Sequence, residues 1–285
     1  MRQSIFNEYF GIEQDPFGLT PNPEFFFASR SHATTLEWMR YAVEQRELGL
    51  VIGKIGSGKT VISRRLVDSL SDDRYRICWI INPQLTPAAM LKEITRQLTG
   101  AEPAYFKRDV LHQLTDALME MRQADQFPVV IIDEAQMVPR KAVFDELRLL
   151  TNYQTDTENL LSILFFGQPE LNRRFKHPAY RALLERIRFT ITLEPLSLDE
   201  VTEYIRHRLK VAGYQGNGLF DEEALVNLWQ IAEGAPRVIN HLASFSLMQA
   251  MSANQSTVTG PLVEKAAGDI LYLQDQLSER AGKSV

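Results

Sequence analysis

Two short motifs in this chain could bind and activate a phosphate ester. The first is Gly53-Lys54-Ile55-Gly56-Ser57-Gly58-Lys59-Thr60, which fits the pattern G-x-x-x-x-G-K-[ST]. Glycines at these positions let the backbone wrap around phosphate oxygens, so that its N–H groups point at the anion. Lys59 can then reach the β- and γ-phosphates, and the Thr60 hydroxyl can ligate Mg²⁺. The motif predicts a nucleoside triphosphate site lined by Gly53, Gly56, Ser57, Gly58, Lys59, Thr60 and Val61.

The second motif is a pair of carboxylates at the end of an apolar run. Asp133 and Glu134 follow the apolar residues 129–132. At the carboxyl end of a central strand, Asp133 would face the phosphate loop and hold the water shell of Mg²⁺. Glu134 would polarise the water that attacks the γ-phosphate. Many buried strands end in an acid, so the prediction depends on the combination of this pair with the loop.

A parallel sheet is needed to bring the two motifs together. Short apolar runs predict strands at 48–52, 76–81, 128–132, 161–166 and 188–193. Helical patterns precede and separate the first four of them, at 31–47, 61–70, 87–99, 106–124 and 141–153. The alternation predicts an α/β fold, with a parallel five-stranded sheet flanked by helices on both faces.

The character of the chain changes near residues 194–196. Ser197 and Glu200 form a capping box, and apolar residues follow at helical spacing. Further helical patterns cover 221–233, 236–252 and 261–273, and no strand pattern remains. We therefore expect an α/β core at 31–194, a small all-helical domain at 195–273 and a polar tail at 274–285.

Residues 1–30 form an aromatic, proline-rich arm. Its aromatic side chains are too many to stay in water: Phe6, Tyr9, Phe10, Phe17, Phe25, Phe26 and Phe27. Two interpretations are open. The arm packs onto the core of the protein, or part of it covers the adenine base of the nucleotide.

The bulk composition is that of an ordinary soluble globular protein, with 45% hydrophobic and 24% charged residues among 285. A net charge of −5 argues against a generally basic nucleic-acid binder, although a local basic surface could form on assembly. Cys78 is the single cysteine and lies in an apolar run, which predicts a small buried hydrophobe. The chain shows no signal peptide and no apolar run of membrane-spanning length, so we expect a cytoplasmic protein.

In its motifs the chain resembles the AAA+ ATPases of the ExeA type, which in turn resemble the TnsC, TniB and MuB transposition regulators. The resemblance runs from Tyr9 to about Ile270. Besides the two motifs it rests on short matches at Pro16-Phe17, 146–152, Gly167-Gln168-Pro169, Glu185-Arg186-Ile187 and 234–240. It implies an AAA+ core with a helical lid, ATP and Mg²⁺ as cofactors, and hydrolysis to ADP and phosphate.

The resemblance also implies three further site residues. Gln168 would sense the γ-phosphate, with an ordinary loop glutamine as the alternative. Arg186 would enter the nucleotide site of a neighbouring subunit and tie hydrolysis to oligomerisation. Arg181 and Arg188 are nearby and could take this role instead. The alternative role for such an arginine is a surface ion pair. Arg237 would close the lid on the nucleotide, unless it only packs its helix.

The resemblance leaves the task of the ATPase open. In the reading that we favour from the sequence, ATP assembles a ring or filament on duplex DNA, without sequence preference, and recruits transposase or targeting proteins. Phosphate contacts of this kind give affinity without base readout, and the candidate residues, unless they are merely solvated helix ends, are Lys107, Arg108, Arg140 and Lys141.

Two other readings compete with it. The chain could serve secretion or pilus assembly with a membrane partner; fuller proteins of that group add a membrane span and a cell-wall-binding domain, and neither is expected in these residues. It could also be a nucleotide-gated scaffold with slow turnover, which a turnover rate would distinguish from a motor.

Overall fold

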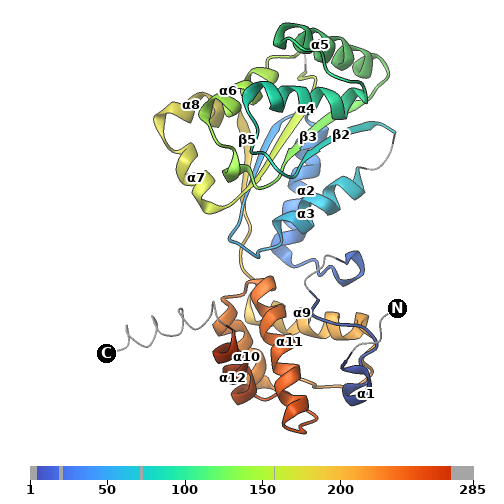
Figure 1. Cartoon of the computed structure of the whole chain (residues 1–285), viewed down its shortest axis with the longest axis vertical. Helices are drawn as coiled ribbons and strands as arrows, with labels where there is room; N and C mark the ends of the chain where they lie inside the picture. Colours follow the sequence, from blue (N-terminus) through green and yellow to red (C-terminus); the bar gives the residue numbers. More distant parts are fainter. Residues whose placement is uncertain (1–4, 19–21, 71–72, 157, 271–285) are drawn as a thin grey trace. The chain divides into compact units, whose positions relative to one another are not determined.

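The computed structural model describes residues 5–18, 22–70, 73–156 and 158–270 (Figure 1). By its internal contacts the chain divides into two units. One unit is Arg30–Leu193, and the other combines Met1–Ser29 with Glu194–Val285. The expected polar tail at 274–285 lies outside the described residues.

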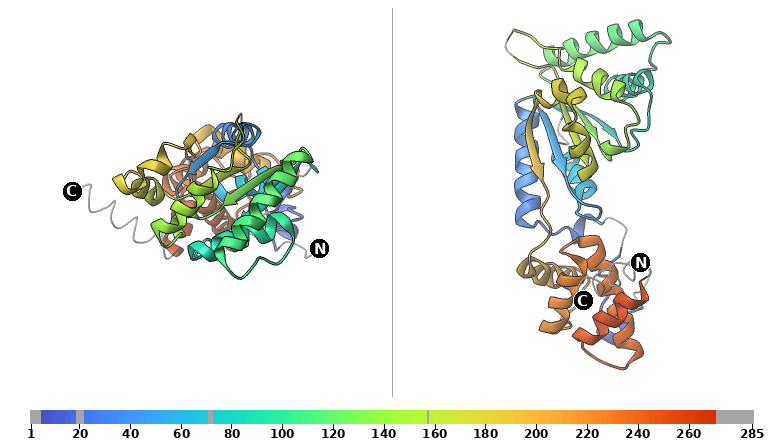
Figure 2. Two further views of the ribbon diagram at one scale, coloured as in Figure 1. Left: turned by 90° about the horizontal axis from the view of Figure 1, so that it is seen from above. Right: turned by 90° about the vertical axis from the view of Figure 1, so that its left-hand side faces the viewer.

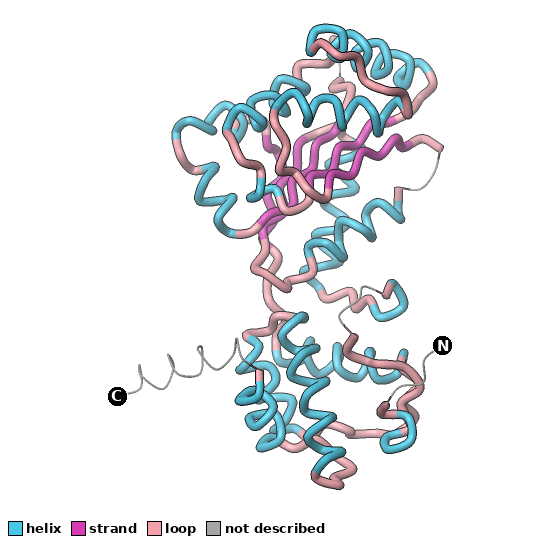
Figure 3. The backbone as a smooth tube through the Cα atoms, in the orientation of Figure 1, coloured by secondary structure: helices cyan, strands magenta, loops and turns pink. Residues whose placement is uncertain are grey.

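A parallel sheet forms the centre of the first unit (Figure 3). Its strands are β1 (Leu48–Ile52), β2 (Tyr75–Ile80), β3 (Phe127–Ile132), β4 (Ser162–Gly167) and β5 (Ile187–Thr192). They lie side by side in the order β2-β3-β4-β1-β5, and every neighbouring pair is parallel. The sheet confirms the predicted α/β fold, and each strand end lies within one residue of its predicted position.

Helices cover both faces of this sheet, as alternating strand and helix patterns predict. On one face, α2 (Arg30–Glu44) and α3 (Lys59–Ser69) enclose a buried cluster with strand residues such as Val51 and Leu164. On the other face lie α4 (Pro87–Thr99), α5 (Lys107–Gln123) and α6 (Lys141–Leu150). Figure 2 (right) shows α2 in blue and α5 in green on opposite sides of the strands. Adjacent residues of a strand therefore face different cores.

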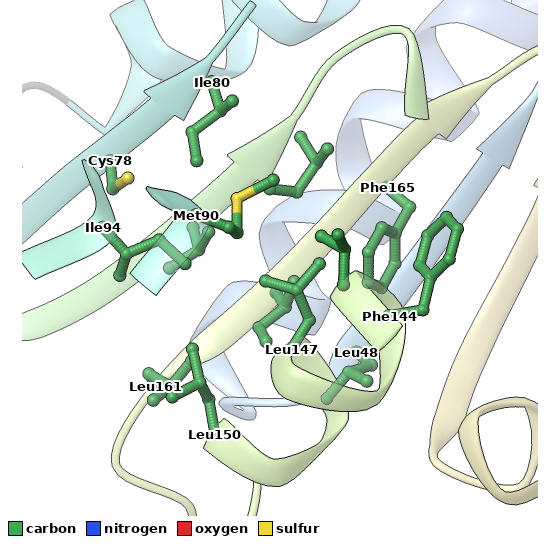
Figure 4. Close-up of a cluster of buried hydrophobic side chains, with 14 of the residues drawn as sticks. Leu48, Cys78, Ile80, Met90, Ile94, Phe144, Leu147, Leu150, Leu161 and Phe165 are labelled. Atoms are coloured by element: carbon green, nitrogen blue, oxygen red, sulfur yellow. The ribbon is translucent and has the colours of Figure 1, made fainter. Parts of the chain in front are cut away.

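The α4–α6 face contains the single cysteine. Cys78 is fully buried and lies near Met90 and Ile94, while Phe144 lies beside Phe165 in the same cluster (Figure 4). Burial raises the pKa of the Cys78 thiol far above its ordinary value. The prediction of a small buried hydrophobe is confirmed.

The helical patterns are less accurate than the strand patterns. They do not predict α1 (Asn7–Phe10), α7 (Pro169–Phe175) or α8 (Arg181–Leu184), which are too short to show a period. The helix predicted at 141–153 ends earlier, at Leu150. The Thr151 hydroxyl donates to the carbonyl of Arg148 and caps that end.

The second unit contains α9 (Leu198–Val211), α10 (Glu222–Ala232), α11 (Pro236–Ser252) and α12 (Gly260–Asp269) around one buried cluster. The capping box of Ser197 and Glu200 starts α9 with both of its reciprocal hydrogen bonds. Between residues 194 and 270, which are all described, the structure has helices and one isolated bridge but no strand. None of the helices in the described part of the chain is long and apolar enough to span a membrane.

The aromatic arm belongs to this second cluster. Phe6, Phe17 and Phe25 are buried together with residues of α9–α12. The buried Arg208 donates from Nε to the carbonyl of Pro16 and from Nη1 to the hydroxyl of Tyr204 at 2.9 Å. The arm therefore packs onto a hydrophobic core, that of the helical unit. Whether part of the arm covers adenine stays a hypothesis.

Candidate nucleotide site

The candidate site forms where three adjacent strands end. β3, β4 and β1 are neighbours, and the carboxyl ends of parallel strands meet at one edge of the sheet. Asp133 follows β3, Gln168 follows β4 and the phosphate loop follows β1. The N–H of Gly53 donates to the carbonyl of Gly167 at 3.1 Å, which joins the loop to the end of β4. The strand order therefore brings residues that are far apart in the chain to one edge.

The phosphate loop has a backbone that requires glycine. Gly56 and Gly58 have φ of 78° and 95°, a region that other residues rarely adopt. A Cβ on Gly53 would lie 2.4 Å from Ser57 Oγ, so a side chain does not fit there either. Ser57 Oγ is buried and has no hydrogen-bond partner among the described residues. A cradle of this shape with an unsatisfied hydroxyl fits an anion.

Lys59 lies within the loop and is 5% exposed. Its Nζ donates to the carbonyl oxygens of Gly53 at 2.8 Å and Lys54 at 2.9 Å. Neutral carbonyls are weaker partners for an ammonium group than a phosphate is. The lysine is thus held at the loop by bonds that a phosphate could replace.

Asp133 faces the first turn of α3. It is 1% exposed, its Oδ2 accepts from Ser63 Oγ at 3.2 Å, and its carboxylate also accepts from the Thr60 hydroxyl. Burial raises the pKa of Asp133 above its ordinary value, and hydrogen bonds from the Glu134 N–H, Thr60 and Ser63 oppose the rise. A nearby divalent cation would stabilise the ionised form. Thr60 and Asp133 together thus offer two oxygen ligands to Mg²⁺.

Glu134 has a strained backbone, with φ of 47° and ψ of 41°. Such left-handed conformations cost energy in residues other than glycine and recur at functional sites. Its Oε2 accepts from Gln168 Nε2 at 3.1 Å and from Gln136 Nε2. Gln136 Oε1 in turn accepts from the Gln168 N–H at 3.0 Å. The three side chains form one hydrogen-bonded cluster that orients the Glu134 carboxylate.

Sequence reasoning missed two residues of this site. Gln136 follows Glu134 by two residues, and this position is the signal that places it close by. Ser63 lies three residues after Thr60, a spacing that puts both hydroxyls on one helix face. That spacing, combined with the expected position of Asp133, could have identified Ser63.

The three candidate arginines are exposed but differ in their partners. Arg181 pairs with Glu185 at 2.9 Å, and Arg188 pairs with Glu47 at 3.3 Å. Arg186 instead donates to two neutral oxygens, Thr151 Oγ1 at 3.4 Å and Asn152 Oδ1 at 3.1 Å. Of the three, only Arg186 has a charge that no carboxylate offsets among the described residues.

Arg237 is the second residue of α11 and is exposed. It belongs to the other unit, so its predicted contact with the nucleotide stays a prediction.

The four candidate DNA contacts are mostly paired with acids. Lys107 binds Glu146 at 2.7 Å, Lys141 binds Asp145 at 2.6 Å, and Arg108 contacts Asp109 at 3.4 Å. Arg140, the residue before α6, is exposed, and its side chain makes no hydrogen bond or ion pair with described residues, although its carbonyl accepts from the N–H of Val143 at 3.1 Å. The structure thus shows no strong basic surface at these helix starts.

Comparison with known proteins agrees with this geometry. Residues 42–175 match the family described as AAA domain. General secretion pathway protein A of Aeromonas hydrophila is 32% identical over 285 residues, which cover 99% of this chain and 51% of that protein. The chain thus spans about half the length of this curated relative.

Solved structures share the fold at low identity. Cdc6p from Pyrobaculum aerophilum superposes with a TM-score of 0.67 at 19% identity, covering 90% of this chain and 70% of that one. Drosophila ORC bound to DNA gives a TM-score of 0.65 at 18% identity, covering 90% of this chain and 64% of that one. Similarity at identities this low shows a shared fold and nothing about function. Residues 42–175 thus match the AAA domain family, and the chain has the fold of the AAA P-loop NTPases.

Proposed function

We propose that this protein is an ATPase of the ExeA type that binds ATP with Mg²⁺, hydrolyses it, and works as an oligomeric switch in a secretion or pilus-assembly process. The observation that carries the proposal is the placement of Asp133 and Glu134 at the phosphate loop. Asp133 accepts from Thr60 and Ser63 of the helix that follows the loop, while Gln168 holds Glu134 at the same edge of the sheet.

Nucleotide binding rests on the loop and Lys59. The backbone N–H groups of the loop would surround the phosphates, and Lys59 would exchange its two carbonyl partners for phosphate oxygens. Thr60 and Asp133 would hold Mg²⁺, which neutralises charge on the phosphates when it is bound.

Hydrolysis rests on Glu134. Both amide groups that contact its side chain bind Oε2, so Oε1 can accept a proton from water. The amide of Gln168 lies beside the carboxylate, where it could also contact a γ-phosphate. Glu134 is the general base of the proposed reaction.

Oligomerisation rests on Arg186. Its partners are a hydroxyl and an amide oxygen, so its charge stays available for an anion. In the proposed assembly it reaches the phosphates of a neighbouring copy and completes that site, and Arg237 closes the lid of its own chain on the nucleotide.

The biological process rests on the relative from Aeromonas hydrophila. Its name places it in a general secretion pathway, and the likeness extends over 99% of this chain. This likeness favours secretion over the transposition reading that we favoured from the sequence. Pairing of Lys107, Arg108 and Lys141 with carboxylates also removes much of the argument for DNA. A membrane-bound protein is the partner that we propose.

Two measurements test the proposal together. ATP turnover is followed in wild type, Lys59→Ala and Glu134→Gln, and we expect no nucleotide binding in the first variant and binding without turnover in the second. Binding of duplex DNA is followed by fluorescence anisotropy with a slowly hydrolysed ATP analogue, with ADP and without nucleotide. DNA binding that depends on the analogue, with filaments or rings on the DNA, would restore the transposition reading. Turnover in Glu134→Gln equal to that of wild type would refute the assignment of Glu134 as the general base.

A further inference from the structure

We propose that His32 is a positioning residue of the nucleotide site, which holds the phosphate loop in its binding conformation. The proposal rests on the proposed function of that loop and assigns it a residue that lies outside every motif considered above. His32 is the third residue of α2, a helix that precedes the loop in the chain and covers the same face of the sheet as α3.

The imidazole contacts the loop directly. His32 is 6% exposed, and its Nε2 lies 2.9 Å from the carbonyl oxygen of Ser57. A carbonyl oxygen can only accept, so Nε2 carries the hydrogen and donates it. This donor holds one peptide of the loop by its oxygen.

The backbone of the next residue, Gly58, lies against the same ring. A Cβ on Gly58 would lie 2.6 Å from His32 Nε2, and the φ of Gly58 is 95°. The loop backbone therefore approaches the imidazole as closely as a residue without a side chain permits. Contact and hydrogen bond act on the same peptide.

This contact determines where a neighbouring donor points. The carbonyl of Ser57 and the N–H of Gly58 belong to one planar trans peptide, in which the two groups point in opposite directions. While His32 holds the oxygen, the N–H of Gly58 faces away from α2. That N–H is one of the donors expected to bind phosphate, so His32 orients a phosphate-binding group before the ligand arrives.

The test compares two variants of similar shape. Glutamine places an N–H donor at about the reach of Nε2, and methionine fills similar space without a donor. We expect His32→Met to raise the Kd of a fluorescent ATP analogue roughly tenfold, the scale of one buried hydrogen bond with an orphaned acceptor. His32→Gln should stay within about threefold of wild type. The exposed His112 of α5 provides the matched control as His112→Met, with no change expected.

A second pair keeps the proposal testable if His32→Met does not fold. His32→Asn is polar but its amide falls short of the Ser57 oxygen, so its Kd should rise like that of the methionine variant while His32→Gln binds normally. Melting temperatures without nucleotide are measured alongside. Equal weakening in the glutamine and asparagine variants, or wild-type affinity in His32→Met, would overturn the proposal. A wild-type protein that binds no ATP would instead refute the proposed function itself.

Discussion

Replacing Gln136 by alanine should slow ATP hydrolysis while leaving ATP binding unchanged. The side chain donates to Glu134 Oε2 and accepts from the N–H of Gln168 at 3.0 Å, and it contacts no residue of the phosphate loop by hydrogen bond. In Gln136→Ala, Glu134 keeps one amide partner, Gln168, on the same oxygen. The carboxylate then rotates more widely and spends less time aimed at the water.

The size of the effect follows from these bonds. A hydrogen bond to a charged group contributes about 1.5–3 kcal/mol, and a general base accelerates a reaction about 10²–10⁴-fold. Since the base remains and only its orientation is lost, we expect kcat to fall roughly 10- to 100-fold, or about 1.4–2.7 kcal/mol in the barrier. The unpaired N–H of Gln168 should lower the free energy of unfolding by about 1 kcal/mol.

The assay measures kcat, the Kd of a fluorescent ATP analogue and the melting temperature in the same preparation. Gln136→Glu is the matched variant: it keeps an acceptor for the Gln168 N–H but puts a like charge beside Glu134. We expect it to lose as much kcat as the alanine variant. A kcat within about twofold of wild type in Gln136→Ala would show that the cluster does not position the base. A rise in Kd that accompanies the fall in kcat would show that Gln136 acts on binding.

The other predictions concern the base, the interface arginine, the buried aspartate and the cysteine. Glu134→Gln should bind ATP normally and lose about 10²–10⁴-fold in kcat, measured by phosphate release. Arg186→Ala should bind ATP but hydrolyse it slowly at every protein concentration, whereas wild-type turnover per subunit should rise with concentration; a concentration-independent wild type would contradict action across an interface. Burial raises the pKa of Asp133 above its ordinary value of 3.8, so between these two pKa values the folded state binds more protons than the unfolded state. Stability therefore falls as pH rises through the raised pKa. Asp133→Asn should thus raise the melting temperature without nucleotide more at about pH 7 than at about pH 4, and an equal rise at both would contradict the cause. The buried Cys78 should react with a thiol reagent only when the protein unfolds, followed by absorbance during a denaturant titration; rapid labelling of the native protein would refute its burial.

Local patterns in the sequence determined much of this protein. Strand and helix periods, the phosphate-loop spacing and the acid pair after an apolar run are each contained in a few consecutive residues. They predicted every strand of the sheet to within one residue at either end and placed Lys59, Thr60 and Asp133 together. Such patterns work because side-chain direction repeats with a period set by the backbone alone.

Only the tertiary structure decided which distant residues meet. The order β2-β3-β4-β1-β5 brings Gln168 beside Glu134, and helix packing brings His32 against the loop at Ser57. The tertiary structure also buries the aromatic arm among α9–α12 and pairs most of the basic candidates with acids. The physical reason is that these contacts depend on the order of strands and the packing of helices, which join residues far apart in the chain and leave no periodic trace in it.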